Sequence, residues 1–176
     1  MLYLFLDIDG VLNHETWYRD VVYPNRSDYI GGRDKYILSC FDPECVKRVN
    51  TILEETGARL VVSSSWRIDN MLKADFERLG LPTDFDITPI KHWTQMKSLD
   101  EEWPTRGEEI EEFLGCHPCD NYVILDDDTD FTEEQLEKHF VHCHADIAHS
   151  LEEGNDGKTG LTERKMLEAI KILKNE

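Results

Sequence analysis

The sequence is poor in positive charge and has no long hydrophobic run. It contains 19 lysine and arginine residues against 37 aspartate and glutamate residues, so the formal net charge over 176 residues is −18. This charge disfavours binding to anionic membranes and extended, non-specific binding to nucleic acid, because such contacts depend on many Lys and Arg side chains. It does not exclude a phosphorylated substrate, whose charge a metal ion and a few local cations can balance.

Signals for export or membrane insertion are also missing. The apolar start of the chain, residues 1–6, is too short for a secretory or membrane-spanning segment, and Asp7 and Asp9 follow it directly. The five cysteines are an odd number, which is typical of reduced thiols rather than of a disulfide framework. We therefore expect a cytoplasmic protein with a single domain over residues 1–176.

Short apolar runs alternate with amphipathic segments along the chain. This alternation predicts an α/β domain, a three-layer Rossmann-like fold around a central parallel sheet. We expect strands at residues 2–8, 59–63, 85–90, 122–125 and 140–143. We expect helices between Asp42 and Gly57, at 69–79, 105–114 and 132–138, and after Thr162.

The segments between these elements set the expected size of any cap over the sheet. Residues 13–41 are irregular and aromatic and contain a Gly-Gly pair, so we interpret them as an early flap or minimal cap. The interval 66–105 has room for one helix, one short strand and a loop, which excludes a large cap. Residues 145–160 are polar and are expected to form a loop. The last helix is expected to turn four side chains inward: Met166, Leu167, Ile170 and Leu173.

Polar side chains gather where three of the expected strands end. These are Asp7 with Asp9, Ser63 with Ser64, and Asp126 with Asp127. Because the carboxyl ends of parallel strands meet at one edge of a sheet, all three pairs should face one crevice. Clustered carboxylates repel one another unless a cation neutralises them, and an all-oxygen ligand set favours Mg²⁺. A solvated acidic turn explains a lone Asp-x-Asp pair equally well, but it does not explain three converging strands.

The motifs in their order resemble the haloacid-dehalogenase-like (HAD) phosphatase superfamily. They are the apolar strand ending in Asp7-Ile8-Asp9-Gly10, then Leu60-Val61-Val62-Ser63, then a cation at a helix start, Arg106, and then Val123-Ile124-Leu125-Asp126-Asp127. The string from Val61 to Arg67, together with Arg106-Gly107 and Gly160-Leu161-Thr162, is similar to the HAD branch associated with RNA-repair (Swiss-army-knife) proteins.

The resemblance implies a role for each matching residue. Asp7 would be the nucleophile that forms an aspartyl-phosphate, and Asp9 the acid/base. Mg²⁺ would be held by the Asp7 carboxylate, the Asp9 backbone carbonyl and the Asp126-Asp127 pair. Ser63 or Ser64 would bind a phosphoryl oxygen, and Arg106 or, as the rival candidate, Lys97 would supply the positive charge. Gly10 lets the chain turn away and leaves room for the ligand.

Two further groups of residues have open interpretations. Trp66 and Arg67 follow the second motif and are candidates to stack on a base and to hold a second phosphate; a core Trp and a structural Arg are the alternative. Cys116 and Cys119 have the spacing of a metal or redox pair. They precede the strand that ends in Asp126, so we expect them away from the acidic cluster, and whether they bind a metal stays open.

The sequence thus favours a magnesium-dependent phosphomonoesterase that acts on nucleotide or polynucleotide-end phosphates. A nucleic-acid end suits an open site without a large cap, whereas the acidic chain favours small phosphoesters. A phosphatase of small metabolites or of phosphoproteins is the first alternative. A non-catalytic binding or regulatory module that keeps the HAD fold is the second.

Overall fold

The structure is a computed structural model that describes residues 1–26, 33–69, 72–89, 104–154 and 156–176. Within these ranges, five strands form one all-parallel sheet in the order β3-β2-β1-β4-β5. The strands are β1 (Leu2–Leu6), β2 (Arg59–Val62), β3 (Asp86–Ile87), β4 (Asn121–Asp126) and β5 (Phe140–His142). The expected α/β class and central parallel sheet are confirmed. The third strand is shorter than expected, with two residues instead of six.

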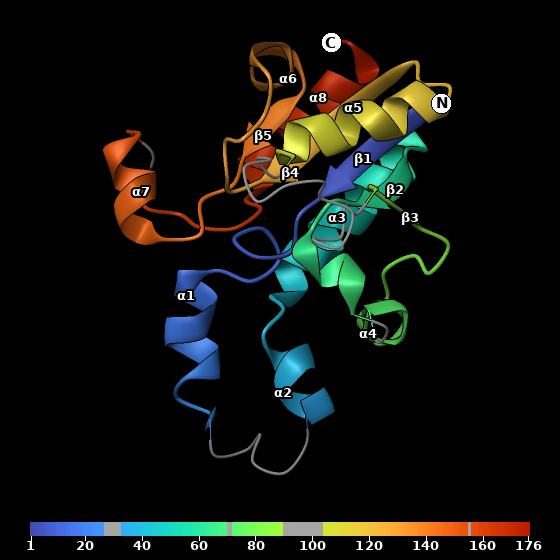
Figure 1. The fold of residues 1–176 in the computed structure, drawn as a ribbon. Coiled ribbons are helices and arrows are strands. Elements are labelled where there is room, and N and C mark those ends of the chain that lie inside the picture. The colour runs from blue at the N-terminus through green and yellow to red at the C-terminus, as the bar shows by residue number, and fades with distance from the viewer. Residues whose placement is uncertain (27–32, 70–71, 90–103, 155) are drawn as a thin grey trace, which may run out of the picture.

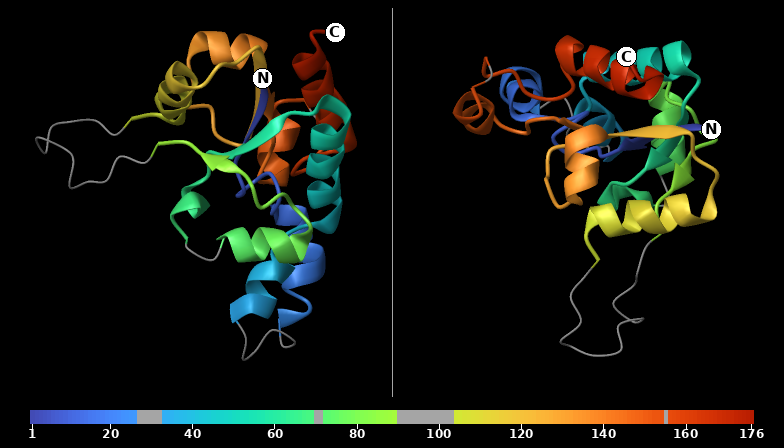
Figure 2. Two further views of the ribbon diagram at one scale, coloured as in Figure 1. Left: turned by 90° about the vertical axis from the view of Figure 1, so that its right-hand side faces the viewer. Right: turned by 90° about the horizontal axis from the view of Figure 1, so that it is seen from above.

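Helices cover both faces of the sheet, so the fold has three layers (Figures 1 and 2). One face packs against α3 (Pro43–Thr56) and α8 (Glu163–Lys174), and α5 (Arg106–Cys116) covers the other. Two smaller helices flank the sheet, α4 (Leu72–Leu79) and α6 (Glu133–Lys138). The two apolar cores explain why the central strands are hydrophobic on both sides rather than alternating.

Local sequence signals explain where the main helices begin and end. The Asp42 side chain accepts a hydrogen bond from the Glu44 amide at the start of α3, and Gly57 ends that helix with φ +67°. Thr105 and Glu108 form a reciprocal capping box at the start of α5, as their spacing predicts. Caps of this kind contribute about 1 kcal/mol each.

In the described part of the early excursion, residues 13–26 and 33–41, the chain is largely helical rather than irregular. It contains α1 (Glu15–Trp17), the π-helical turn η1 (Tyr18–Val22) and α2 (Arg33–Ser39). Helices α1 and α2 both lie beyond the end of the sheet that β1 points to (Figure 1). The segment that we interpreted as a flap or minimal cap therefore contains helices at that end of the domain.

Three other expectations are corrected. The expected loop at 145–160 contains a short helix, α7 (Ile147–Glu152), which Asp146 caps. Asp69, expected to be helical, has an extended backbone and ends the 3-10 turn η3 (Ser65–Ile68). On α8, Leu167 is 49% exposed and Lys165 is buried in its place. Among the described residues, no helix is both long enough and apolar enough to cross a membrane.

Candidate active site

The strand ends deliver polar side chains to one edge of the sheet, as the sequence predicts. Leu6 is in register with Val62 on β2 and with Leu125 on β4, so the residues that follow these three positions lie side by side. Those residues are Asp7, Ser63 and Asp126. All three are buried. The register of the parallel strands therefore builds the centre of the site.

The same three residues also share a face of the sheet. Successive residues of a strand point to opposite faces, so Asp7 continues the row of Tyr3 and Phe5, and Asp126 continues the row of Ile124. That row forms the apolar core under α5. Arg106 is the first residue of α5. The helix that covers this face thus brings its first side chain to the acidic groups at the sheet edge.

Arg106 bridges two carboxylates. Its Nη1 lies 2.7 Å from Asp7 Oδ1 and 2.8 Å from Asp126 Oδ2. The contact to Asp126 is a hydrogen bond as well as an ion pair. Asp7 is 1% exposed, and the described groups that act on its carboxylate are Arg106, the Ser64 hydroxyl and the Ile8 backbone. A buried carboxylate is costly unless other groups bind it.

The electrostatics of the cluster point to a missing positive charge. Burial raises the pKa of Asp7, and Arg106 and the nearby Ser64 hydroxyl only partly oppose this. Burial and the adjacent Asp7 raise the pKa of Asp126, and they raise that of Asp127 to about 6. One guanidinium thus does not compensate three converging carboxylates.

The residues at this edge fit a hard divalent cation. Asp7, Asp126 and Asp127 can each offer one carboxylate oxygen, and these atoms lie within 4.8 Å of one another. Gly10, with φ +70°, lies so close to Asp127 that a Cβ atom there would overlap its carboxyl group. Mg²⁺ prefers oxygen ligands, and the negative charge of these carboxylates is not fully balanced by Arg106. The site therefore suits this ion.

Asp9 lies in a different environment from Asp7. It is exposed, and its carboxylate accepts hydrogen bonds from Trp66 Nε1 at 2.9 Å and from Asn13 Nδ2 at 2.7 Å. Asn13 also accepts a hydrogen bond from the Gly10 amide at 3.1 Å. The second acid is therefore held in a fixed direction while it stays open to solvent. This arrangement suits a group that exchanges protons.

The two serines after β2 are not equivalent. Ser63 Oγ is buried and has no hydrogen-bond partner among the described residues, whereas the Ser64 side chain accepts a hydrogen bond from the Trp66 amide and caps η3. An unpartnered hydroxyl beside Asp7 is available to a ligand. The two hydroxyls thus differ, since that of Ser63 is unpartnered and that of Ser64 acts on the Asp7 carboxylate.

Arg67 is tied into the protein framework. Its Nη1 donates to the backbone carbonyls of Ser63 and Ser64, and its Nη2 lies 2.6 Å from Glu109 Oε2. Both members of this ion pair are nearly buried, with side chains 7% and 13% exposed. Arg67 thus joins the serine loop to α5, which fits its structural interpretation better than direct contact with a substrate.

Three further residues lie near the site. Thr88 follows β3, is fully buried, and its hydroxyl has no partner among the described residues. Asn13 orients Asp9. His142 Nε2 lies 3.0 Å from the Asp127 carbonyl oxygen. Thr88 lies inside the strand expected at 85–90 and reaches the strand end only because β3 stops at Ile87, so the strand-end rule did not point to it. The contact of Asn13 depends on loop geometry that the sequence pattern does not specify.

Two sequence candidates lie elsewhere. Lys97, the rival to Arg106, falls outside the described residues. Cys116 is exposed and Cys119 half-buried, and both are free thiols. Among the described side chains, neither belongs to a group of three His, Cys, Asp or Glu ligand atoms close enough to share a metal ion.

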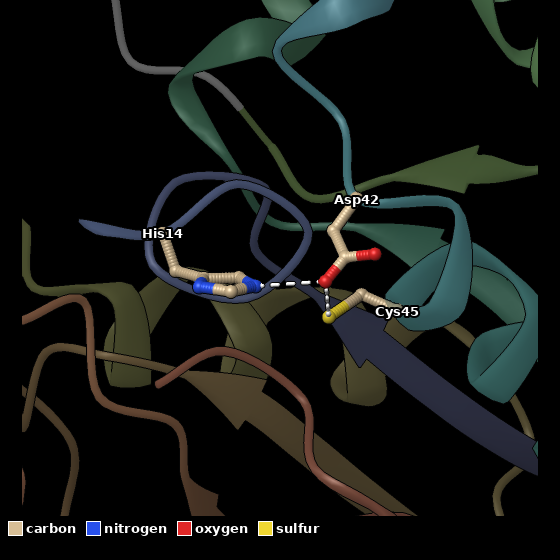
Figure 3. A group of neighbouring side chains, drawn as sticks. All are labelled: His14, Asp42 and Cys45. Carbon is tan, nitrogen blue, oxygen red and sulfur yellow. Dashed lines mark hydrogen bonds and ion pairs between the residues drawn. The ribbon is translucent and has the colours of Figure 1, made fainter. Parts of the chain in front are cut away.

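A second compact group lies just past the acidic motif. His14 Nε2 lies 3.0 Å from Asp42 Oδ2, and the Cys45 thiol is directed at the same oxygen at 3.7 Å (Figure 3). Thr159 Oγ1 lies 2.7 Å from the other ring nitrogen of His14. Hydrogen bonding accounts for this group, which joins the loop after Asp9 to the start of α3.

The sheet is all-parallel, and an acid pair follows its central strand. A serine follows the strand on one side, a second acid pair follows the strand on the other, and the covering helix supplies a cation. This combination defines a haloacid-dehalogenase-like (HAD) domain. More narrowly, the chain belongs to the family described as the HAD domain in Swiss Army Knife RNA repair proteins, whose family model matches residues 3–153. Comparisons with curated proteins and with solved structures found no match.

Proposed function

We propose that the protein is a magnesium-dependent phosphomonoesterase that works through an aspartyl-phosphate and acts on nucleotide or polynucleotide-end phosphates. The observation that carries this proposal is the state of Asp7. Its carboxylate is buried at the end of the central strand, Arg106 lies 2.7 Å away, and the acidic Asp126 and Asp127 lie close enough to share a metal ion with it. A carboxylate presented in this way is a nucleophile with a cation beside it to stabilise an incoming phosphoryl group.

In the first step, an Asp7 oxygen forms a bond to phosphorus as the bond from phosphorus to the ester oxygen breaks. Asp9 gives its proton to the leaving oxygen. Ser63 Oγ donates a hydrogen bond to a phosphoryl oxygen, and Arg106 offsets the negative charge on the transferred group. The hydrogen bonds from Trp66 and Asn13 keep the Asp9 carboxyl group in place for this transfer.

In the second step, water attacks phosphorus and Asp9 takes its proton. The bond between phosphorus and the Asp7 oxygen breaks, which releases phosphate and restores both carboxyl groups to their initial states. Mg²⁺ held by Asp7, the Asp9 carbonyl, Asp126 and Asp127 would neutralise charge on the phosphoryl group.

Two observations support a nucleotide or nucleic-acid end as the substrate. The family is that of HAD domains in RNA repair proteins. The chain is strongly acidic, with 37 acidic residues against 19 basic ones, which opposes binding along a polynucleotide but leaves a single terminal phosphate accessible to a metal-supported site. Small metabolites and phosphoproteins are the alternative substrates. A non-catalytic binding module is the alternative to an enzyme.

A substrate panel tests this proposal. Phosphate release is measured with Mg²⁺ on mononucleotides, 3′- and 5′-phosphorylated oligonucleotides, sugar phosphates and phosphopeptides. Wild type is compared with Asp7→Asn and with Asp84→Asn, which removes the same charge at an exposed position away from the site. We expect wild type and Asp84→Asn to release phosphate from nucleotides or oligonucleotides and Asp7→Asn to be inactive. No release from any phosphoester would favour the binding module.

A further inference from the structure

A cavity of about 920 Å³ lies between α1, α7, α8 and the loop that precedes α8. None of Asp7, Asp9, Ser63, Asp126 and Asp127 lines it, so it is distinct from the candidate active site. The Glu15 amide donates to the Ala145 carbonyl, and the Ile147 amide donates to the Glu15 side chain, which fixes α1 beside α7 (Figures 1 and 2). The walls of the cavity are therefore joined by direct hydrogen bonds.

The charge of this cavity is opposite to that of the chain. Five Arg and Lys residues line it against three Asp and Glu residues, whereas the whole chain has 19 against 37. The cations are Arg19, Arg48, Lys158, Arg164 and Lys165. A concave surface that concentrates positive charge in an acidic protein raises the local concentration of anions.

Lys165 distinguishes this cavity from an ordinary basic surface. The residue is 4% exposed, and its Nζ is buried with no hydrogen-bond partner among the described residues. An ammonium group in that position has lost its hydration without receiving acceptors in return. Burial accordingly lowers the pKa of Lys165 from its usual value. An anion in the adjacent cavity would supply the missing acceptors, and the flexible lysine stem can adjust to it.

The start of α8 adds a second source of positive potential. This helix has 12 residues, and Thr162, Glu163 and Arg164 of its first turn line the cavity beside Lys165. The first amides of a helix carry partial positive charge and bind phosphate oxygens. Thr159 Oγ1, which also lines the cavity, lies within hydrogen-bonding distance of both His14 and Thr16 and so joins this wall to α1.

The pairs made by the outer cations are weak enough to exchange for a ligand. Arg19 pairs with Asp20 and Lys158 with Asp156, and all four side chains are more than half exposed. Arg48 lies 3.9 Å from Glu44 and donates to the Leu161 carbonyl. Exposed ion pairs contribute little stability, so a doubly charged anion competes with them readily.

We propose that this cavity binds a phosphate group, with Lys165 and the first turn of α8 as its centre and the outer cations as its rim. The ligand chemistry is an oxyanion, supplied either by a free phosphate or pyrophosphate or by a backbone phosphate of an oligonucleotide. The site does not depend on the proposed catalytic function, since it shares none of the catalytic residues.

Calorimetric titration in the presence of EDTA tests this site without hydrolysis or metal binding at Asp7. The probes are pyrophosphate and an oligoribonucleotide without terminal phosphates. The variants are Lys165→Met and, as a matched control on the exposed side of the same helix, Lys171→Met. We expect Lys165→Met to weaken binding about tenfold or more, because it removes the charge that contacts the anion. Lys171→Met should bind like wild type.

The two probes separate the sources of the phosphate. Binding of the oligoribonucleotide that weakens in Lys165→Met assigns the site to a backbone phosphate, and binding of pyrophosphate alone assigns it to a free anion. If Lys165→Met fails to fold, Lys158→Gln on the rim replaces it, with a smaller loss of affinity expected. Absence of binding by wild type at about 10 mM, well beyond millimolar affinity, or equal affinity of wild type and the variant, overturns the proposal.

This outcome is independent of the substrate panel. Phosphate release by a protein that binds neither probe would overturn the cavity proposal and leave the catalytic one standing. Binding at the cavity by a protein that hydrolyses no phosphoester would support the cavity proposal and contradict the catalytic one.

Discussion

Trp66 Nε1 donates a hydrogen bond to Asp9 Oδ2 at 2.9 Å. The indole thus holds the carboxyl group that we propose as the acid/base, and its ring packs edge-on against Phe41 at 5.5 Å between centroids. The sequence offered Trp66 as a stacking platform for a base or as a core residue. The structure suggests a third interpretation, in which Trp66 positions the Asp9 side chain.

Replacing Trp66 by Phe tests this positioning. Phe keeps an aromatic ring against Phe41 but lacks the N–H donor. Hydrogen bonds to charged groups contribute about 1.5–3 kcal/mol, so we expect kcat to fall about 10- to 100-fold. KM and Mg²⁺ affinity should change little. Trp17→Phe, which removes an indole hydrogen bond to the Ser39 carbonyl in the flap, is the matched control. A purely structural role for Trp66 would give the two variants the same kinetics.

Asp9→Asn separates proton transfer from metal binding. The proposed metal contact of Asp9 is its backbone carbonyl, which the substitution keeps. We therefore expect Mg²⁺ affinity close to that of wild type and kcat reduced about 10²- to 10⁴-fold, the usual contribution of general acid–base catalysis. Calorimetric Mg²⁺ titration and steady-state kinetics measure the two quantities. Loss of Mg²⁺ affinity as severe as in Asp7→Asn would contradict this division of roles.

Gly10→Ala tests whether the turn after Asp9 must leave room for Asp127. The substitution adds a methyl group that would overlap the Asp127 carboxyl group, and it places a side chain at φ +70°. Gly57 has φ +67° but open space around it, so Gly57→Ala carries the same backbone strain alone. We expect both variants to lose about 1–2 kcal/mol of unfolding free energy. Only Gly10→Ala should also lose Mg²⁺ affinity and turnover; equal Mg²⁺ affinity in both would refute the steric argument.

His144 should make the protein sensitive to mild acid. Burial lowers the pKa of His144 to about 4, with Lys165 and His142 acting in the same direction, His149 adding slightly, and Glu153 opposing them. Between about pH 6.5 and pH 4 the unfolded chain binds a proton that the folded chain does not, so stability falls as the pH falls through this window. The loss from about pH 7 to about pH 5 amounts to about 2 kcal/mol.

Denaturant unfolding at both pH values measures this loss. His144→Gln should lose about 2 kcal/mol less than wild type over the interval, whereas His149→Gln, at an exposed position, should behave like wild type. A stability difference between His144→Gln and wild type that does not change with pH would show that His144 keeps the same protonation state in the folded and unfolded protein.

The parts of the fold that follow from periodicity and strand ends were predictable. Residues 2–6 are apolar, and Asp7 and Asp9 follow them, so both the central strand and the position of Asp7 could be predicted from the pattern. The capping box of Thr105 and Glu108 fixed the start of α5 and, with it, the place of Arg106.

The parts that depend on contacts between distant loops were not predictable. Residues 13–41 have no clear period, although their described part is largely helical. Lys165 is buried on α8, whereas Leu167, which was expected to turn inward, is 49% exposed. The sequence left open whether Arg67 holds a phosphate or has a structural role, because its partner, Glu109, lies 42 residues further along the chain. Sequence pattern alone does not record such partners.

The most direct test of the central claim is to look for the phosphoryl group on Asp7. Wild type is mixed with a phosphorylated nucleotide or oligonucleotide and Mg²⁺, quenched in acid within one turnover, digested and mapped by mass spectrometry. Asp9→Asn, which should slow breakdown of the intermediate, is treated in the same way. The account predicts phosphate on the peptide that contains Asp7 and none in Asp7→Asn. Phosphate release at the wild-type rate by Asp7→Asn, or turnover with the phosphoryl group on another residue, would contradict it.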